Sequence, residues 1–508
     1  MKVVLKKGPQ SDLSTLVIFT AKEPKSGKLS MAKLSGDMQT LVEQAQIEAG
    51  FTGGKKESLF FRRANVDGYA HVLLVGLGEA SEMTPELVRI AGSIVYGALK
   101  TQKVKSAGIH LDSLNKFFEA SADGVQALTE GLELSAYEYS ELKSKPKKSK
   151  KEEAAAAEAP LQEIVLLTSS APTGAQQKAL QRAEILSEYQ NFARRLGDTP
   201  GNYMTPTLLA EATVQAAKGT GLKVTVWDKA RIKKERFGGL MAVSRGSAEE
   251  PRFIIMEYNG GAKKSQAPVC FVGKGLTFDT GGISIKPSQS MEEMKYDMCG
   301  GAAVIATMLA LAKLKAKVNV IGLVPSSENM PGPEATKPGD VYIARNGKSV
   351  EVFNTDAEGR LILGDALAYA SEQKPTAIFD AATLTGAILV ALGNTHTGVF
   401  TRDAKLMRRI QDASERTGEL VWPMPLTEFH SEDIKGTHAD LCNISPGRMA
   451  GSSTAAAFLQ EFVDRDIPFA HFDIAGTAWN VSSRFPYCPK KGASGAIVRT
   501  FVELAESY

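Results

Sequence analysis

The chain has 508 residues, of which 43% are hydrophobic and 23% charged, as in ordinary globular proteins long enough for two or more domains. Its formal net charge of +3 is too small to argue by itself for binding to nucleic acid or to an acidic membrane. The N-terminal stretch MKVVLKKGPQ lacks the apolar core of a signal peptide, and the longest apolar run, about Ala302 to Ala312, is far short of a membrane span. We therefore expect a cytoplasmic protein without a membrane partner.

Residues 1–172 alternate strand-like and helical segments. The strand-like runs are VVLKK, TLVIFT, HVLLVGLG and IVLLT, and helical spacing is found at Glu86–Leu99 and Gly124–Leu134. This alternation predicts a small N-terminal α/β domain. The glycines in Gly76-Leu77-Gly78 follow a strand-like run, but the third glycine of a dinucleotide-binding loop is missing, which favours a tight turn.

A low-complexity segment, Lys143–Pro160, follows, with six lysines between Lys143 and Lys151. Three glutamates partly neutralise the lysines and no aromatic residue interrupts them, which favours a mobile, solvated loop over a nucleic-acid contact. The four cysteines are far apart, form no CxxC motif and are expected to be free thiols: Cys270, Cys299, Cys442 and Cys488.

Apolar residues at helical spacing over Ala175–Leu196 predict a connecting helix, which we place at residues 173–196. Thr205 and Pro206 predict the start of a further helix that runs to about Ala217. From Leu222 onward, β-branched runs alternate with helical segments. This predicts a larger C-terminal α/β domain, residues 197–508, with a mostly parallel central sheet covered by helices.

Three chemically useful residues follow strand-like runs of this domain. Lys274 follows VCFVG, Asp356 follows VEVF, and Thr383 follows AIFDAA. If these strands are parallel, the three residues share one edge of the sheet. Ligands of open α/β sheets bind at the carboxyl ends of the strands, so we expect the site there.

Two stretches concentrate the charged residues of this edge. They are GKGLTFDTGGISIKPSQSMEEMKYDMCGG, from Gly273 to Gly301, and NTDAEGRL, from Asn354 to Leu361. Together they supply four carboxylates, two amines and a guanidinium: Asp279, Asp297, Asp356, Glu358, Lys274, Lys286 and Arg360. Crowded carboxylates raise one another's pKa, and divalent cations commonly relieve this repulsion.

Asp356 and Glu358 alone would be better explained as acids at a helix N-terminus, where they complement the helix dipole. With Asp279 and Asp297 also available, metal ligation becomes the better explanation. Oxygen ligands suit Mg²⁺ or Mn²⁺, and Zn²⁺ also accepts carboxylates. All six histidines lie outside the two stretches, which argues against a histidine-based zinc site.

The two stretches resemble the paired signatures of the leucine aminopeptidase (cytosol aminopeptidase) family of two-metal exopeptidases. NTDAEGRL matches that family's signature without a departure, and the upstream spacing of lysines and aspartates matches as well. The resemblance covers the chain from about Leu196 to the C-terminus and is weak over the first 170 residues.

This resemblance implies two metal ions, Mn²⁺ or Zn²⁺ with Mg²⁺ as an alternative, that share Asp279 and Glu358. One ion would be held by Lys274, Asp279, Asp297 and Glu358, and the other by Asp279, Asp356 and Glu358 with the Asp356 carbonyl. Two ions about 3.5–4 Å apart can share a hydroxide nucleophile. By the same resemblance, Lys286 would polarise the scissile carbonyl, and Arg360 would hold a bicarbonate that shuttles the proton.

The resemblance further implies an aminopeptidase that releases N-terminal leucine or other apolar residues from peptides and assembles as a homohexamer of two stacked trimers. Its side-chain pocket would be formed by Met294, Thr383, Leu384, Gly386 and Ala475, with Leu384 contributing a backbone contact. Plain core packing is the alternative for Met294 and Ala475.

Two other functions stay open at this point. A two-metal phosphoesterase would also use clustered carboxylates, although it would more often bring histidine ligands. A DNA-binding or regulatory role through the N-terminal domain would need a basic surface on that domain, and salt-dependent retention on DNA would test it.

Overall fold

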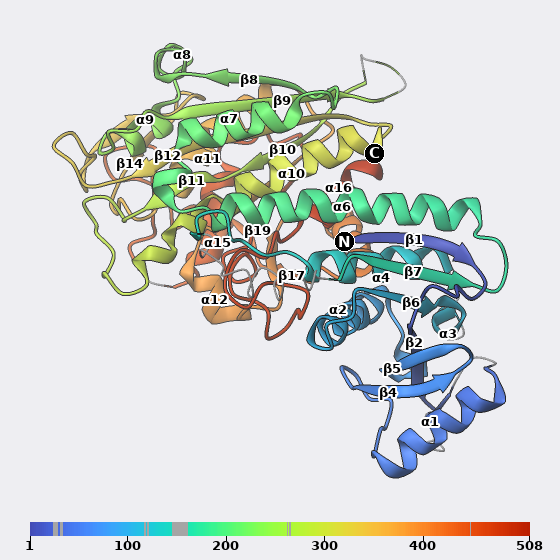
Figure 1. Ribbon diagram of the computed structural model, residues 1–508. Coiled ribbons are helices and arrows are strands. Elements are labelled where there is room, and N and C mark those ends of the chain that lie inside the picture. The colour runs from blue at the N-terminus through green and yellow to red at the C-terminus, as the bar shows by residue number, and fades with distance from the viewer. Residues whose placement is uncertain are drawn as a thin grey trace. The chain divides into compact units, whose positions relative to one another are not determined.

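The computed structural model describes residues 1–23, 29–30, 34–115, 118, 121–144, 161–261, 263, 266–447 and 449–508 (Figure 1). Residues 145–160 of the segment predicted as a mobile loop lie outside the described residues. Two compact units are present, residues 1–187 with 485–489 and residues 188–484 with 490–508. The units divide within helix α6 (Gly174–Asp198), and our domain boundaries at residues 172 and 197 stay a proposal.

The first unit contains, among its described residues, a seven-stranded sheet in the order β1-β7-β6-β2-β5-β4, with β3 paired to β2. Its strands are β1 (Lys2–Lys7), β2 (Thr15–Lys22), β3 (Leu29–Ser30), β4 (Ser58–Val66), β5 (Tyr69–Glu79), β6 (Ser106–His110) and β7 (Glu163–Thr168). Its helices are α1 (Gly36–Glu48), η1 (Ala80–Glu82), α2 (Pro85–Thr101), α3 (Leu111–Asn115) and α4 (Ser121–Ser135).

Apolar side chains along β2 point alternately to the two faces of the sheet, which explains why helices cover both faces. Val17 and Phe19 belong to the hydrophobic cluster that includes Val95 of α2. Ile18, which points the other way, belongs to a separate cluster with Leu41 of α1. The predicted small α/β fold of this part of the chain is therefore confirmed.

The second unit contains, over its described residues, a nine-stranded sheet in the order β17-β16-β19-β15-β10-β12-β9-β8, with β11 paired to β12. Its strands are β8 (Lys223–Trp227), β9 (Arg252–Asn259), β10 (Val269–Gly273), β11 (Gly275–Asp279), β12 (Asn319–Asn329), β15 (Ala377–Ala382), β16 (Thr397–Phe400), β17 (Val421–Met424) and β19 (Phe469–Asp473). The neighbours β19, β15, β10 and β12 pair in parallel, as predicted, whereas β9 pairs antiparallel to both β12 and β8.

Helices accompany both faces of this sheet: η2 (Gly201–Tyr203), α7 (Pro206–Ala217), α8 (Lys229–Lys234), α9 (Gly238–Ser244), η3 (Met291–Met298), α10 (Cys299–Leu314), α11 (Gly359–Glu372), α12 (Gly386–Leu392), α13 (Ala404–Thr417), α14 (Glu428–Glu432), α15 (Gly451–Gln460) and α16 (Val498–Glu506). On β10, Phe271 contacts Phe501 of α16 with ring centroids 4.7 Å apart. Its neighbour Val272 instead belongs to the cluster that contains Ile362 of α11. The carboxyl ends of the central strands therefore emerge between two helical layers.

Two local predictions were wrong. The VEVF run does not enter the central sheet, because β14 (Ser349–Glu351) pairs with β13 (Val341–Ile343) and β18 (Leu441–Cys442) in a separate small sheet. Gly76 and Gly78 form no tight turn but lie within β5, where a Cβ on Gly76 would meet the Gly54 carbonyl oxygen at 2.3 Å. A glycine is needed there for close packing rather than for reversing the chain.

Helix α10 contains the longest apolar run of the sequence. Together with η3 it forms one segment, Met291–Leu314, that is long and apolar enough to cross a membrane, but 89% of its most apolar window is buried inside the protein. Such burial is typical of the core helix of a globular domain. The four cysteines are free thiols and buried, as expected from their spacing.

Gly300 lies where α10 approaches the sheet closely, so a substitution there tests whether this close approach is needed. A Cβ at this position would lie 2.1 Å from the carbonyl oxygen of Ala381 on β15. We expect Gly300→Ala to lower the free energy of unfolding by about 1–3 kcal/mol or more, because backbone cannot move aside as a side chain can. Gly97→Ala is the control, since a Cβ in that helical position meets nothing within 4 Å. It should raise stability by about 0.5–1 kcal/mol. Equal melting temperatures for the two variants in calorimetry would contradict the interpretation that close packing requires glycine at position 300.

Candidate functional site

The site begins where β10 ends. Lys274 directly follows β10, and its backbone N–H donates to the carbonyl oxygen of Ala381 at 3.0 Å. Its own carbonyl oxygen accepts the N–H of Gly301 at 2.7 Å, at the start of α10. The lysine side chain is thereby buried between β10, β15 and α10. The parallel pairing of β10 with β15 confirms that Lys274 and Thr383 follow adjacent strands at one edge of the sheet.

Asp279 is the last residue of β11, and its position depends on the glycines that follow. Its Oδ1 accepts the N–H of Gly281 at 2.9 Å. Gly281 has a φ of +88°, and a Cβ there would lie 2.5 Å from the Ser284 carbonyl oxygen. The chain can therefore turn back sharply, and the N–H of Lys286 donates to the Thr280 carbonyl oxygen at 2.9 Å.

Asp356 and Glu358 precede α11 in a turn that is attached to this same loop. The Thr355 hydroxyl donates to the Gly281 carbonyl oxygen at 2.6 Å, and the Asp356 N–H donates to Asn354 Oδ1 at 2.9 Å. Glu358 occupies the N-cap position of α11 and is buried. The second stretch thus reaches the site through hydrogen bonds to the first stretch, not through a strand of the central sheet.

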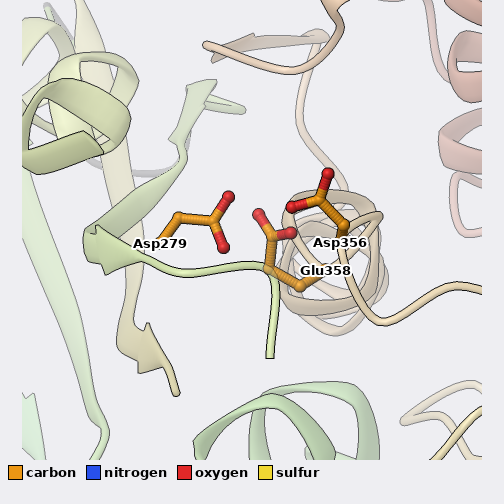
Figure 2. Close-up of side chains that lie close together, drawn as sticks. All are labelled: Asp279, Asp356 and Glu358. Carbon is orange, nitrogen blue, oxygen red and sulfur yellow. The ribbon is translucent and has the colours of Figure 1, made fainter. Parts of the chain in front are cut away.

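Three carboxylates from these two stretches meet in one place. Figure 2 shows Asp279, Asp356 and Glu358 turned toward one another, and one carboxylate oxygen from each lies within 4.8 Å of the other two. Each side chain offers oxygen atoms, the ligands that Mg²⁺, Mn²⁺ and Zn²⁺ all accept. The predicted set for one ion is therefore brought together by the fold.

Both lysines lie among the carboxylates. Lys274 Nζ is 2.7 Å from Asp297 Oδ2 and 2.9 Å from Glu358 Oε1. Lys286 Nζ is 2.8 Å from Asp279 Oδ2 and 2.5 Å from Asp356 Oδ1. Four negative and two positive formal charges leave this group with a charge of −2. That residual charge, enclosed largely in protein, suits a further cationic partner.

The pKa values of the buried carboxyls and of Lys274 are shifted by burial and by the charges of their neighbours. Burial, reinforced by Asp279, raises the pKa of Glu358 to about 8, and burial raises the pKa of Asp297 to about 6. Burial opposes the charged form of Lys274, but Asp297 and Glu358 outweigh it and raise the pKa of that lysine. Bound divalent cations would reverse the carboxylate shifts, since they favour the ionised form.

Arg360 lies on the first turn of α11, beyond the carboxylates. Its Nη1 donates to the Asn443 carbonyl oxygen at 2.7 Å, while its buried Nε has no hydrogen-bond partner among the described residues. Burial lowers the pKa of Arg360 to about 10. A buried guanidinium with an unused donor fits a small oxyanion such as bicarbonate.

The predicted pocket residues lie on three segments around this group. Met294 is on η3, three residues before Asp297, and Ala475 follows β19. Thr383 and Leu384 follow β15, and Gly386 begins α12. Thr383 joins pocket and carboxylates directly, because its hydroxyl donates to Asp297 Oδ1 at 2.6 Å and its carbonyl oxygen accepts from Lys274 Nζ at 3.2 Å.

Two residues beside this site, Asn329 and Asp473, were not predicted from the sequence. The Asn329 amide donates to Asp279 Oδ1 and to the Thr355 carbonyl oxygen, both at 2.9 Å, and so holds the two stretches together. Asp473, at the end of β19, accepts from the backbone beside the pocket. Both are polar residues that end strands of the central sheet, which marks their place at this edge but does not reveal their partners.

Comparison with known proteins identifies the family of this chain. Residues 191–502 match the model of the cytosol aminopeptidase family, catalytic domain, and residues 16–146 match the model of the same family's N-terminal domain. The likeness therefore includes residues 16–146, within the part of the chain where the motifs gave only weak resemblance.

Individual relatives cover almost the whole chain. A probable cytosol aminopeptidase of Bdellovibrio bacteriovorus is 54% identical over 97% of this chain and 96% of its own length. One of Burkholderia mallei is 42% identical over 96% of this chain and 93% of its own length.

Solved structures of similar proteins share the fold of this chain. A variant of tomato leucine aminopeptidase is 31% identical, with a TM-score of 0.86 over 100% of this chain and 97% of its own. The bottromycin maturation enzyme BotP in complex with Mn is also 31% identical, with a TM-score of 0.83 over 97% of this chain and 99% of its own. From the matched domains, the identities and the shared fold, the chain belongs to the cytosol aminopeptidase family and is an aminopeptidase that acts on peptides.

Proposed function

We propose that the protein removes N-terminal residues, preferably leucine or other apolar residues, from peptides with the help of two divalent metal ions. The observation that supports this most is the charge of −2 left by four carboxylates and two lysines directly beside the pocket residue Thr383. Family membership favours peptide hydrolysis over the phosphoesterase alternative. We place this activity in the cytoplasm and in a homohexamer, as the family resemblance implies.

The residues fit two ions. We assign Lys274, Asp279, Asp297 and Glu358 to one ion, and Asp279, Asp356 and Glu358 to the other. Lys274 would give up its proton on binding the ion, because an ammonium group has no lone pair to offer a metal. Carboxylates suit Mn²⁺, Zn²⁺ or Mg²⁺, and the Mn in the bottromycin maturation enzyme supports manganese as one occupant. When bound, such ions supply Lewis-acid polarisation of a carbonyl and activation of water. Asn329, which donates to Asp279, keeps that shared carboxylate oriented.

Lys286 is suited to act on the scissile carbonyl. Its side chain is 23% exposed, so it lies at the open side of the group, whereas Lys274 is 3% exposed. Burial disfavours its charge, but Asp279, Glu358 and Asp356 raise its pKa, so the ammonium group stays protonated and can donate. A protonated donor aimed at a developing oxyanion stabilises it more than the neutral carbonyl.

Arg360 is suited to hold bicarbonate. Its unused Nε belongs to the residue two positions after Glu358, so a bicarbonate held there would supply a base beside the carboxylate group. The pocket lined by Met294, Thr383, Leu384, Gly386 and Ala475 offers small and apolar surface for a leucine side chain. A free α-amine next to the carboxylate group completes the recognition of an N-terminus.

The first prediction tests the charge balance with metal removed. Lys274→Met should lower the free energy of unfolding of chelator-treated protein by about 3–5 kcal/mol, because it leaves buried carboxylates without their partner. Adding Glu358→Gln should restore part of that loss. Lys313→Met, at an exposed lysine on α10, is the control and should change little. Urea unfolding measures all four proteins, and a loss that Glu358→Gln does not relieve would contradict the balance.

The second prediction separates ligands from catalytic groups. Asp356→Asn should lose metal and lower kcat by orders of magnitude with the fold intact. Lys286→Ala should keep both ions and lower kcat by about 10²–10³, as loss of an oxyanion donor does. Arg360→Ala should also keep both ions, cost less, and abolish any stimulation of the parent enzyme by bicarbonate. Mass spectrometry of the metals, run beside kinetics, decides this. If Lys286→Ala loses an ion, Lys286 is a ligand.

The third prediction concerns the substrate's N-terminus. Acetyl-leucine p-nitroanilide should not be hydrolysed, while leucine p-nitroanilide should be, because the acetyl group removes the basic amine that the carboxylate group attracts. The same enzyme preparation assayed with both compounds provides its own control. Comparable kcat/KM for the two would show an endopeptidase or amidase instead.

A further inference from the structure

Asp473 lies beside the two segments that carry four of the five pocket residues. It is the last residue of β19, and the parallel register pairs it with Ala382, next to Thr383. The residue is only 1% exposed. The sheet therefore places a buried carboxylate at the turn between β15 and α12, on the same edge as Lys274.

The Asp473 carboxylate collects hydrogen bonds from both segments. Its Oδ1 accepts the backbone N–H groups of Leu384 at 3.2 Å, Thr385 at 3.4 Å and Ala475 at 3.2 Å. Its Oδ2 accepts the Thr385 hydroxyl at 2.6 Å. Leu384 and Ala475 are themselves pocket residues, so one side chain joins two walls of the pocket through their backbones.

Thr385 connects the Asp473 carboxylate to the start of α12. Its Oγ1 is the N-cap that accepts the Ile388 N–H at 3.2 Å, and it lies 2.7 Å from Ser452 Oγ. Because the single hydroxyl proton of Thr385 points to Asp473, the oxygen is free to accept from Ile388 and Ser452. The rotamer of Thr385, and with it the start of α12 at Gly386, is therefore set by Asp473.

The turn from Thr383 to Gly386 is thus attached at two points. At one end Thr383 is hydrogen-bonded to Asp297 and Lys274 in the carboxylate group. At the other end Thr385 and Leu384 are hydrogen-bonded to Asp473. The hydrogen bonds of Thr383 fix the pocket relative to the carboxylate group, and the hydrogen bonds to Asp473 fix the position of the pocket wall.

We propose that Asp473 is a positioning residue that sets the shape of the side-chain pocket and thereby the enzyme's preference among N-terminal residues. The proposal rests on the pocket assignment in the proposed function. Asp473 acts through the backbones of Leu384, Thr385 and Ala475. Hydrophobic pockets discriminate between side chains through small differences in fit, so a shifted wall changes the relative rates of two substrates.

The chain offers a matched control. Asp365 on α11 is also buried and also accepts three backbone N–H groups, from Gly239 at 2.8 Å, Leu240 at 3.0 Å and Arg345 at 2.8 Å. None of these three residues belongs to the pocket. Replacing either aspartate by asparagine exchanges one acceptor oxygen for an NH₂ group at the same kind of buried backbone site, so a general loss of stability would affect both variants.

The test compares parent, Asp473→Asn and Asp365→Asn on leucine and alanine p-nitroanilides, with metal content and melting temperature measured alongside. Asparagine keeps one acceptor oxygen but cannot accept the Thr385 hydroxyl through its NH₂. We expect Asp473→Asn to lower the leucine-to-alanine ratio of kcat/KM by about 10-fold, mainly through KM for leucine, with metals retained. Asp365→Asn should keep the parent ratio. Because Arg360 and Lys286 serve both substrates alike, the ratio isolates the pocket.

Thr385 provides a second test if Asp473→Asn does not fold. Thr385→Val removes the hydroxyl that donates to Asp473 and should shift the ratio in the same direction, while Thr385→Ser keeps the hydroxyl and should keep the ratio. A parent-like ratio in the Asp473 and Thr385→Val variants, or an equal shift in Asp365→Asn, overturns the positioning role alone. A parent enzyme that hydrolyses both substrates with equal kcat/KM overturns the pocket assignment, and this proposal with it.

Discussion

Repulsion between buried carboxylates is the constraint on which the rest of this structure depends. Asp279, Asp297, Asp356 and Glu358 are crowded at one edge of the mostly parallel central sheet, and Lys274 and Lys286 offset two of their four formal charges. Such a group cannot form by hydrophobic collapse alone, because each unpaired charge loses solvation when it is buried. The surrounding protein must therefore hold the carboxylates against their mutual repulsion, which it does through hydrogen bonds from the Gly281 backbone N–H, the Asn329 amide and the Thr383 hydroxyl.

Close backbone approach makes that restraint possible. A Cβ on Gly273 would lie 2.5 Å from the Gly300 carbonyl oxygen, and one on Gly359 would lie 2.7 Å from Lys274 Nζ. The absence of side chains at these positions lets α10 and α11 begin directly against the ends of the strands. Lys274 can then lie buried there, with its ammonium group between the carboxylates of Asp297 and Glu358.

Which charged residues gather at this site is predicted from the sequence better than how the chain brings them together. Residues within each stretch are close along the chain, so spacing alone placed Lys274 near Asp279 and Asp356 near Glu358. The VEVF run was assigned to the central sheet because a short β-branched segment does not reveal which strands it will pair with. Asn329 and Asp473 escaped notice because their partners lie far away in the chain, 50 residues from Asp279 and 89 from Leu384. Contacts of that range are set by sheet register, which a local pattern does not encode.

The raised pKa of Glu358 has a consequence for how the site would be filled. Burial raises the pKa of this carboxyl to about 8, so it binds a proton more tightly than an ordinary glutamate does when only lysines neutralise the group. A divalent cation would then compete with a proton for this carboxylate. Loading would release protons into the solvent, and acidification would weaken the binding of the metal. The carboxylate that both ions are proposed to share would therefore make occupancy of the site depend on the acidity of its surroundings.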